Sequence, residues 1–252
     1  MHIPDGFIDA PISLAAGAVA IAGVGVCIRK AANDLDDRLP PLAGLVAAFV
    51  FAAQMLNFPV AAGTSGHLLG GVLAAVLVGP WAGALCVSVV LVIQALLFAD
   101  GGLTALGLNI VNMALVGALG GYAVFVGLRR LFPKARGGLL AAAGVASWVS
   151  VMMACTAFSI EYALGGTGGA SWTTVAGAML GVHALIGIGE AAITVLIVGA
   201  VLAVRPDLVY GARDLIRGRA PLPTAPAAPL GAGAVATSGA PGTASRREGA
   251  WQ

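Results

Sequence analysis

The first two residues of the chain, Met1 and His2, carry three nitrogen atoms that can bind one metal ion. The amine of Met1 and the amide nitrogen of His2 close a five-membered ring around a metal, and the same amide and the imidazole Nδ1 close a six-membered ring. Three nitrogens in one plane suit Ni(II), Cu(II) and low-spin Co(II), whereas Zn(II) prefers a tetrahedron. Both the amine and the imidazole must be deprotonated to bind, so loading should weaken in acid. The alternative is that His2 is a polar residue at a frayed chain end.

A planar site needs a fourth ligand, and the chain has only two other histidines, His67 and His183. His67 follows a loop rich in Gly, Ser and Thr, in which the hydroxyl groups of Thr64 and Ser65 could orient its ring. An interfacial or packing role for His67 is the alternative. Two histidines on one side of a membrane, one of them at a chelating terminus, favour a metal site.

Five further polar residues are candidates to support such a site without binding the ion: Asp5, Asn57, Asp100, Asn109 and Asn112. Asn109 and Asn112 lie three residues apart and so share one side of a helix. They could cover the site and hydrogen-bond the amino-terminal segment. Helix capping and hydrogen bonding between helices explain them equally well.

Three further ionisable residues, Glu161, His183 and Glu190, lie in or beside the last two expected spans. His183 and Glu190 are seven residues apart and share one helix face, where ionisable groups inside a membrane usually face the bundle interior or a partner. They can be interpreted as metal ligands, a proton path, a structural pair or contacts to other subunits. Glu161 is expected to be solvated. The three cysteines show no metal-binding spacing and are expected to be small apolar fillers: Cys27, Cys86 and Cys155.

The composition predicts that all these residues are carried by membrane helices. Hydrophobic residues make up 59% of the 252 and charged residues only 10%, against about 25% charged residues in soluble domains. Runs of roughly 17–25 apolar residues can cross a bilayer as helices. The sequence therefore predicts an all-α integral membrane protein with about seven transmembrane helices. The expected spans are 11–28, 41–57, 66–79, 81–98, 105–127, 138–160 and 174–204.

The basic residues predict the orientation. With seven spans, all 13 Lys and Arg residues fall on one face, which the positive-inside rule identifies as cytoplasmic. The amino terminus is then outside and the carboxyl terminus cytoplasmic. No cleavable signal peptide is visible, and Met1 should be retained because histidine is a large second residue. The net charge of +2 therefore gives no sign of nucleic-acid binding.

Four parts follow from this organisation. Residues 1–10 form a metal-chelating segment, 11–204 a transmembrane domain, 205–219 a basic juxtamembrane segment, and 220–252 a disordered tail rich in Pro, Ala and Gly. No P-loop motif is present, so ATP would have to be hydrolysed by another chain.

Four stretches of the sequence resemble the CbiM/NikM family: MHIPDGF, GTSGHLLGG, FADGGLTALGLNIVNMALVG and HALIGIGEAAIT. The resemblance covers roughly residues 1–204. It implies the substrate-capture component of an energy-coupling factor (ECF) transporter for nickel or cobalt, a non-enzymatic protein of the plasma or inner membrane. It further implies that the metal is held by the Met1 amine, the His2 amide and imidazole, and His67, with the amino-terminal segment inserted towards the bundle.

The same resemblance implies the partners: a scaffold membrane subunit (T), a pair of ATPase subunits, and often a small accessory membrane protein. Because it places the metal elsewhere, it favours a structural pair or subunit contacts for His183 and Glu190. Nickel and cobalt both accept the nitrogen ligands, and a rigid plane favours Ni(II) slightly.

Two other functions remain as alternatives. GTSG at residues 63–66 fits the GxSG sequence of rhomboid intramembrane proteases, with Ser65 as nucleophile and His183 as base. However, Ser65 follows only two expected spans, and this interpretation leaves His2 and His67 unexplained. A vitamin-binding capture component is the second alternative, but it would need a roomy pocket with aromatic walls, and no aromatic cluster is visible on the outer side.

Overall fold

The computed structural model describes residues 1–34, 39–60 and 65–216. The long helices are α1 (Ala10–Asn33), α2 (Leu39–Gln54), α4 (Pro80–Leu97), α7 (Arg136–Gly165) and α8 (Trp172–Val204). A further helix runs through α5 (Leu106–Asn109), the π-helix Ile110–Gly120 and α6 (Gly121–Leu131). The short elements are α3 (Gly71–Val78), the 3-10 turns Pro206–Leu208 and Tyr210–Ala212, α9 (Arg213–Ile216), and the antiparallel strands β1 (Phe58–Pro59) and β2 (Ser65–Gly66). The predicted tail 220–252 lies outside the described residues.

Five helices of the described part are long and apolar enough to cross a membrane: α1, α4, the 106–131 helix, α7 and α8. This confirms a helical protein with several apolar spans, while the count of seven stays a prediction. The 16 residues of α2 form a shorter apolar helix. The eight residues of α3 span only about 12 Å at 1.5 Å per residue.

The expected span 66–79 is helical only from Gly71 onward, because glycines at its start permit a different backbone. Gly70 has φ 73°, in the left-handed region that favours glycine. A Cβ on Gly71 would lie 3.0 Å from the backbone nitrogen of Ala118, so the start of α3 packs directly against the π-helix. The residues before Gly70 form a loop inside the protein, and this loop carries His67.

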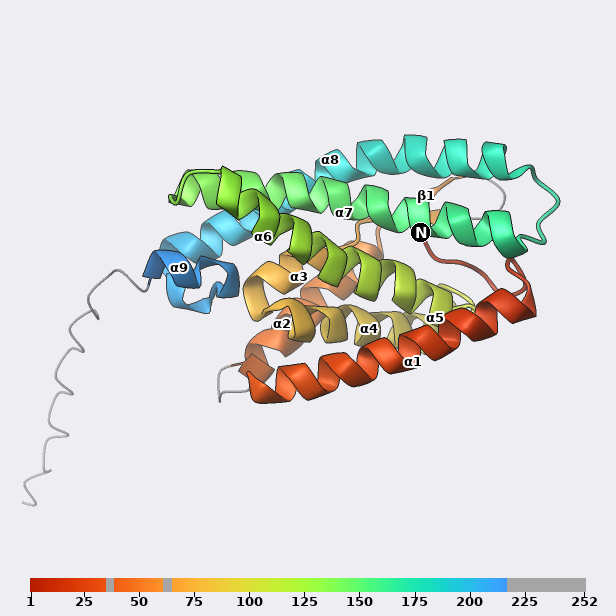
Figure 1. Cartoon of the computed structure of the whole chain (residues 1–252), viewed down its shortest axis with the longest axis horizontal. Coiled ribbons are helices and arrows are strands. Elements are labelled where there is room, and N and C mark those ends of the chain that lie inside the picture. Colours follow the sequence, from red (N-terminus) through yellow and green to blue (C-terminus); the bar gives the residue numbers. More distant parts are fainter. Residues whose placement is uncertain (35–38, 61–64, 217–252) are drawn as a thin grey trace, which may run out of the picture. The chain divides into compact units, whose positions relative to one another are not determined.

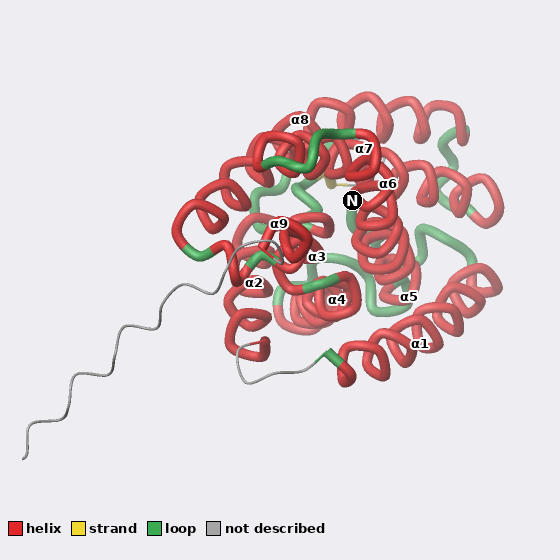
Figure 2. Tube along the Cα trace, turned by 60° about the vertical axis from the view of Figure 1, so that its left-hand side comes forward, coloured by secondary structure: helices red, strands yellow, loops and turns green. Residues whose placement is uncertain are grey.

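The amino-terminal segment, residues 1–9, lies between the helices (Figures 1 and 2). Met1 and Ile3 are 1% and 0% exposed and belong to one apolar cluster with residues of α4, the π-helix and α7. A second apolar cluster lies around α3, with side chains from α2, α6, α7 and the 209–212 turn. The first cluster therefore has the start of the chain as part of its core.

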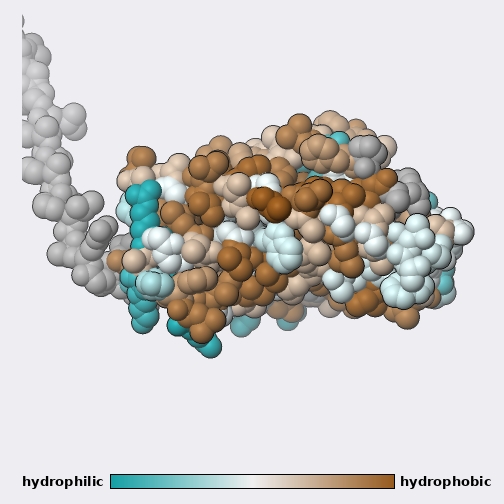
Figure 3. All heavy atoms as spheres, turned by 90° about the horizontal axis from the view of Figure 1, so that it is seen from above, coloured by the Kyte–Doolittle hydropathy of each residue, from teal (hydrophilic) through white to brown (hydrophobic). Residues whose placement is uncertain are grey.

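Charge is distributed unequally between the two ends of the helices. The amino-terminal segment pairs with the end of α7 and the loop after it, through an isolated bridge between Ile8 and Gly166. The described Lys and Arg residues occur at the opposite ends of the helices from this bridge. There Arg129 forms an ion pair with Asp214 at 2.7 Å, and Arg136 donates to the Gly199 carbonyl. Figure 3 shows mostly apolar surface between the ends, with the strongly hydrophilic side chains of that face gathered near its left-hand end. This separation agrees with the expected orientation, which itself stays a prediction.

Candidate metal centre

The amino-terminal segment is packed inside the protein and is not frayed. The Asn109 side chain accepts a hydrogen bond from the Ile3 amide at 2.8 Å and donates one to the Ile3 carbonyl at 3.3 Å. The Ile3 carbonyl also accepts from the Gly102 amide at 2.8 Å. Asn109 therefore makes the contact with the segment that the sequence suggested for it.

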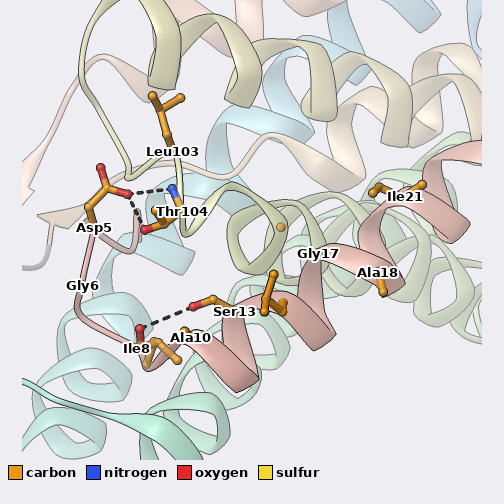
Figure 4. A pocket seen from close by; sticks show the side chains of 12 residues that line it. Asp5, Gly6, Ile8, Ala10, Ser13, Gly17, Ala18, Ile21, Leu103 and Thr104 are labelled. Carbon is orange, nitrogen blue, oxygen red and sulfur yellow. Dashed lines mark hydrogen bonds between the residues drawn. The ribbon is translucent and has the colours of Figure 1, made fainter.

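Further along, the segment is held by two loops. The Asp5 Oδ1 atom accepts hydrogen bonds from the amide and the hydroxyl of Thr104, at 2.7 and 2.6 Å (Figure 4). Thr167 donates its hydroxyl to the Gly6 carbonyl and its amide to the Phe7 carbonyl. Asp9 then caps α1 by accepting from the Ile12 amide. Side chains and backbone from three regions of the chain thus fix residues 3–9.

The buried amine and two imidazoles meet at the start of this segment. The Met1 amine donates to the carbonyl of Ser65, two residues before His67. The rings of His2 and His67 stack with centroids 4.3 Å apart and planes 26° apart. Nitrogen donors from the chain start and from the loop before α3 are therefore side by side.

The Nε2 of His67 is available as a lone-pair donor. His67 is fully buried, and its Nδ1 donates to the Leu68 carbonyl at 2.7 Å, so its Nε2 carries the lone pair. Neither this Nε2 nor the Nε2 of His2 has a hydrogen-bond partner among the described residues. A planar nitrogen complex needs the lone pairs to converge on one point, so at least one stacked ring would have to turn to bind an ion.

Burial keeps these groups uncharged. It lowers the pKa of the Met1 amine to about 4 and, together with the neighbouring amine, lowers the pKa of His2 to about 3. Burial, the amine and His2 also hold the pKa of His67 well below its ordinary value. At neutral pH the three groups are therefore present in the form that binds a metal.

The remaining candidate residues divide between the site and other parts of the protein. The Asp100 carboxylate lies 3.6 Å from the His2 Nε2 and accepts from the Asn57 side chain at 3.0 Å. Ser65 contributes its carbonyl to the amine, and Thr64 lies outside the described residues. Asn112 instead donates to Glu161 of α7 at 2.6 Å, which links two helices. The expectation that Glu161 is solvated is wrong, because it is half-buried and bonded to this amide.

His183 and Glu190 have separate partners, so the expected structural pair is not formed. The Nδ1 of His183 donates to the Met179 carbonyl at 2.9 Å. The two carboxyl oxygens of Glu190 accept from the amides of Leu69 and Gly70, at 2.7 and 2.6 Å. Sequence reasoning missed this contact with the His67 loop, because backbone amides carry no residue-type signal.

Side chains alone do not form a metal site in the part of the chain that the structure describes. No three His, Cys, Asp or Glu residues there are grouped so that they could hold an ion. A site at His2 and His67 therefore depends on backbone nitrogens.

The three cysteines are free and buried, as expected for small apolar fillers: Cys27, Cys86 and Cys155.

A groove of 860 Å³ runs beside the segment, along the first half of α1 (Figure 4). Asp5, Ser13 and Thr104 provide polar groups on its wall, and most of the remaining lining is apolar. Neither His2 nor His67 lines it, so the groove is separate from the candidate metal centre.

Comparison with known proteins identifies metal transporters. A family model described as CbiM, cobalt uptake substrate-specific transmembrane region, matches residues 2–208. A putative fused nickel transport protein NikMN of Archaeoglobus fulgidus is 42% identical over 209 residues, which cover 83% of this chain and 68% of the relative. The cobalt transport protein CbiM of Sorangium cellulosum is 34% identical over 217 residues, covering 83% and 94%. The crystal structure of a truncated transition metal transporter superposes with a TM-score of 0.75 at 30% identity, covering 81% of this chain and 99% of that one.

Proposed function

The chain belongs to the CbiM family of cobalt and nickel transport proteins, and from this premise we propose that it is the metal-capture subunit of an ECF-type uptake transporter. Its substrate is Ni(II) or Co(II), the ions that the names of its relatives carry. The amine of Met1, the amide nitrogen and Nδ1 of His2, and the Nε2 of His67 bind the ion in one plane.

One observation carries this proposal: the buried start of the chain lies against a buried imidazole, that of His67, whose Nε2 has no hydrogen-bond partner among the described residues. His2 stacks on His67, and the Met1 amine contacts the backbone two residues before His67. An imidazole whose Nδ1 donates to a carbonyl is held in the tautomer and orientation typical of a metal ligand. Hydrogen bonds to Ile3 and Asp5 keep Met1 and His2 inside the protein.

The transport cycle requires other subunits. The ion is captured from outside the cell membrane, and ATPase subunits acting through a scaffold membrane subunit drive its delivery inward, with a small accessory membrane protein as a further partner. The absence of a P-loop motif supports ATP hydrolysis by other subunits. The basic residues at one end of the helices support the orientation, with that end in the cytoplasm. The same four nitrogens accept Ni(II) and Co(II), and a rigid plane gives Ni(II) a slight advantage.

Adding one alanine before Met1 tests the proposed ligands. The extension turns the Met1 amine into a peptide group, so the five-membered ring between that amine and the His2 amide is lost from the buried site. Any planar chelate that the extended Ala-Met-His end could still form on its own would contain four nitrogens already and would not use His67. The nickel affinity of the purified full chain, measured by calorimetry, should fall more than about 100-fold, since changing groups behind the ligands alone costs roughly 10–100-fold in metal proteins. Intact mass spectrometry checks that Met1 is the terminal residue of the unextended protein and that its amine is free.

Substitutions complete the test. His2→Ala and His67→Ala should each abolish tight nickel binding, whereas His183→Ala removes a buried imidazole outside the proposed ligands and should retain it. The proposal fails if the extended protein binds nickel as tightly as the original chain and still requires His67 to do so. Proteolysis or vitamin binding, the two alternatives, would be insensitive to the extension.

A further inference from the structure

We propose that Glu190 is a positioning residue that orients His67 through the Leu68–Leu69 peptide group and thereby sets the preference of the site for planar metal ions. The inference rests on the proposed function, since it concerns the ligand His67. It assigns a role to a buried carboxyl group that lies on α8, far along the chain from the proposed ligands.

The contacts form a continuous chain from the imidazole to the carboxyl group. The Nδ1 of His67 donates to the carbonyl oxygen of Leu68 at 2.7 Å. The amide nitrogen of Leu69, which belongs to the same peptide group as that carbonyl, donates to the Oε2 of Glu190 at 2.7 Å. A peptide group is planar and rigid, so fixing its N–H also fixes its carbonyl. Glu190 therefore determines where the hydrogen-bond acceptor of the His67 ring lies.

Two more hydrogen bonds hold the same stretch of backbone. The Oε1 of Glu190 accepts from the Gly70 amide at 2.6 Å. The carboxyl group therefore makes two hydrogen bonds to the residues that lead into α3. From α2, the side chain of Gln54 donates to the Leu69 carbonyl at 2.7 Å. Gln54 and Glu190 are 0% and 3% exposed, so water does not compete for these contacts. Residues from two helices thus clamp the loop next to His67.

The arrangement has a known counterpart in metal sites. A metal-binding histidine commonly donates its second ring nitrogen to a carboxylate or carbonyl, which fixes the ring and makes it a better electron donor. Here a peptide group stands between the ring and the carboxyl group, and hydrogen bonds in series strengthen one another. The Nε2 of His67 is left buried, without a hydrogen-bond partner in the described part of the chain.

Fixing His67 matters because Ni(II) and Zn(II) prefer different geometries. Ni(II) accepts four nitrogens in a plane, whereas Zn(II) prefers a tetrahedron. A ring held in one orientation delivers the fourth nitrogen to the plane defined by Met1 and His2. A ring free to move would accommodate a tetrahedral ion more readily, so the clamp should favour nickel over zinc.

The substitution Glu190→Gln tests this role in the full-length chain. Glutamine replaces one of the two accepting carboxyl oxygens by an NH₂ donor, which would face one of the two amides. Nickel affinity should fall about 10–100-fold and zinc affinity less, so the nickel-to-zinc affinity ratio should fall about tenfold. The absorption spectrum of the nickel complex should lose its square-planar character. Glu161→Gln is the matched control, because this carboxyl group on α7 bonds to Asn112 and not to the His67 loop, and it should keep the wild-type ratio.

A second variant separates positioning from general stability. Gln54→Met keeps the side-chain length and removes only the donor to Leu69, so it should lower the affinity ratio in the same direction by a smaller factor. Thermal melting without metal establishes which variants are folded, and Gln54→Met decides the question if Glu190→Gln does not fold. A wild-type ratio in the folded variants would overturn the positioning role while leaving the proposed function intact. Failure of the wild-type chain to bind nickel would instead reject the proposed function and the positioning role together.

Discussion

The substitution Asn109→Ala should release the amino-terminal segment from its docked position. Asn109 is buried and makes two hydrogen bonds to Ile3, accepting from its amide at 2.8 Å and donating to its carbonyl at 3.3 Å. Without the side chain, the buried Ile3 amide has lost its acceptor, while the Ile3 carbonyl still accepts from Gly102. An unsatisfied buried donor costs about 1–3 kcal/mol, and the weaker second bond contributes roughly 1 kcal/mol.

Together these contributions amount to about 2–4 kcal/mol, equivalent to a factor of roughly 30–700 in the equilibrium between docked and released segment. Hydrogen exchange of the metal-free full-length chain in lipid nanodiscs measures this equilibrium through the amides of residues 2–9. Their protection should fall by that factor, down to the limit set by unhindered exchange. Under the proposed function nickel affinity should fall too, because the proposed ligands come together only when the segment is docked.

Asn112→Ala provides the control for this experiment. Asn112 lies on the same helix three residues further on, but it donates to Glu161 and makes no hydrogen bond to the segment. Protection of residues 2–9 should therefore remain near its wild-type value. Unchanged protection in Asn109→Ala would refute the reasoning, and an equal loss in both variants would show that the helix, and not the bond to Ile3, holds the segment.

Two further substitutions probe the same docking. A Cβ on Gly102 would overlap the Asp5 amide and lie 2.7 Å from the Pro4 carbonyl carbon, so Gly102→Ala should displace the segment and lower nickel affinity. A Cβ on Gly25 would meet no atom within 4 Å, so Gly25→Ala should leave the affinity unchanged. Calorimetry on both variants tests this, and tight nickel binding by Gly102→Ala would contradict the packing. Asp5→Ala removes the bonds to Thr104, but Asp5 is exposed and water can replace them, so hydrogen exchange should show a smaller loss of protection than in Asn109→Ala. A loss as large as that of Asn109→Ala would show that the exposed contact, and not the buried one, dominates docking.

The sequence predicted the candidate ligands because their chemistry is local. The chelate of Met1 and His2 needs only adjacent residues, and His67 stands out as one of three histidines in a chain with few charged groups. The helical class followed from hydropathy, and the long helices overlap most of the expected spans. Asn109 was recognisable as a polar residue at the start of an apolar run, although its partner Ile3 lies 106 residues away.

The length of α3, the partners of Glu190 and the burial of Glu161 depend on tertiary contacts, which neighbouring residues in the sequence do not reveal. Hydropathy could not distinguish the eight-residue α3 from a membrane span, since the residues of the loop before it are also mostly small or apolar. Glu190 lies 121 residues from Leu69, and its partners are backbone amides, which every residue except proline possesses. Glu161 was misjudged for the same reason, because only the packing of α7 against the π-helix brings Asn112 to it.

The loop that carries His67 also explains why the chain start belongs inside the protein. Non-helical backbone at membrane depth is tolerated only when other protein groups or a water-filled cavity satisfy its hydrogen bonds. The carbonyl of Ser65 accepts from the Met1 amine, and the polar groups of Leu69 are taken by Gln54 and Glu190. Removing the amino-terminal segment would therefore deprive the loop of a donor as well as the ion of its proposed ligands.

The same contacts set a condition on transport under the proposed function. Because hydrogen bonds within the protein hold the ligand-bearing segments together, binding requires little ordering beyond the turn of a ring, which favours tight capture. Release then requires that at least one ligand leave its place, against the hydrogen bonds that hold Ile3 to Asn109 or the His67 loop to Glu190. Under the proposed function, ATP-driven partner subunits supply the energy for that step, so delivery of the ion should require them to deform one of these two contacts.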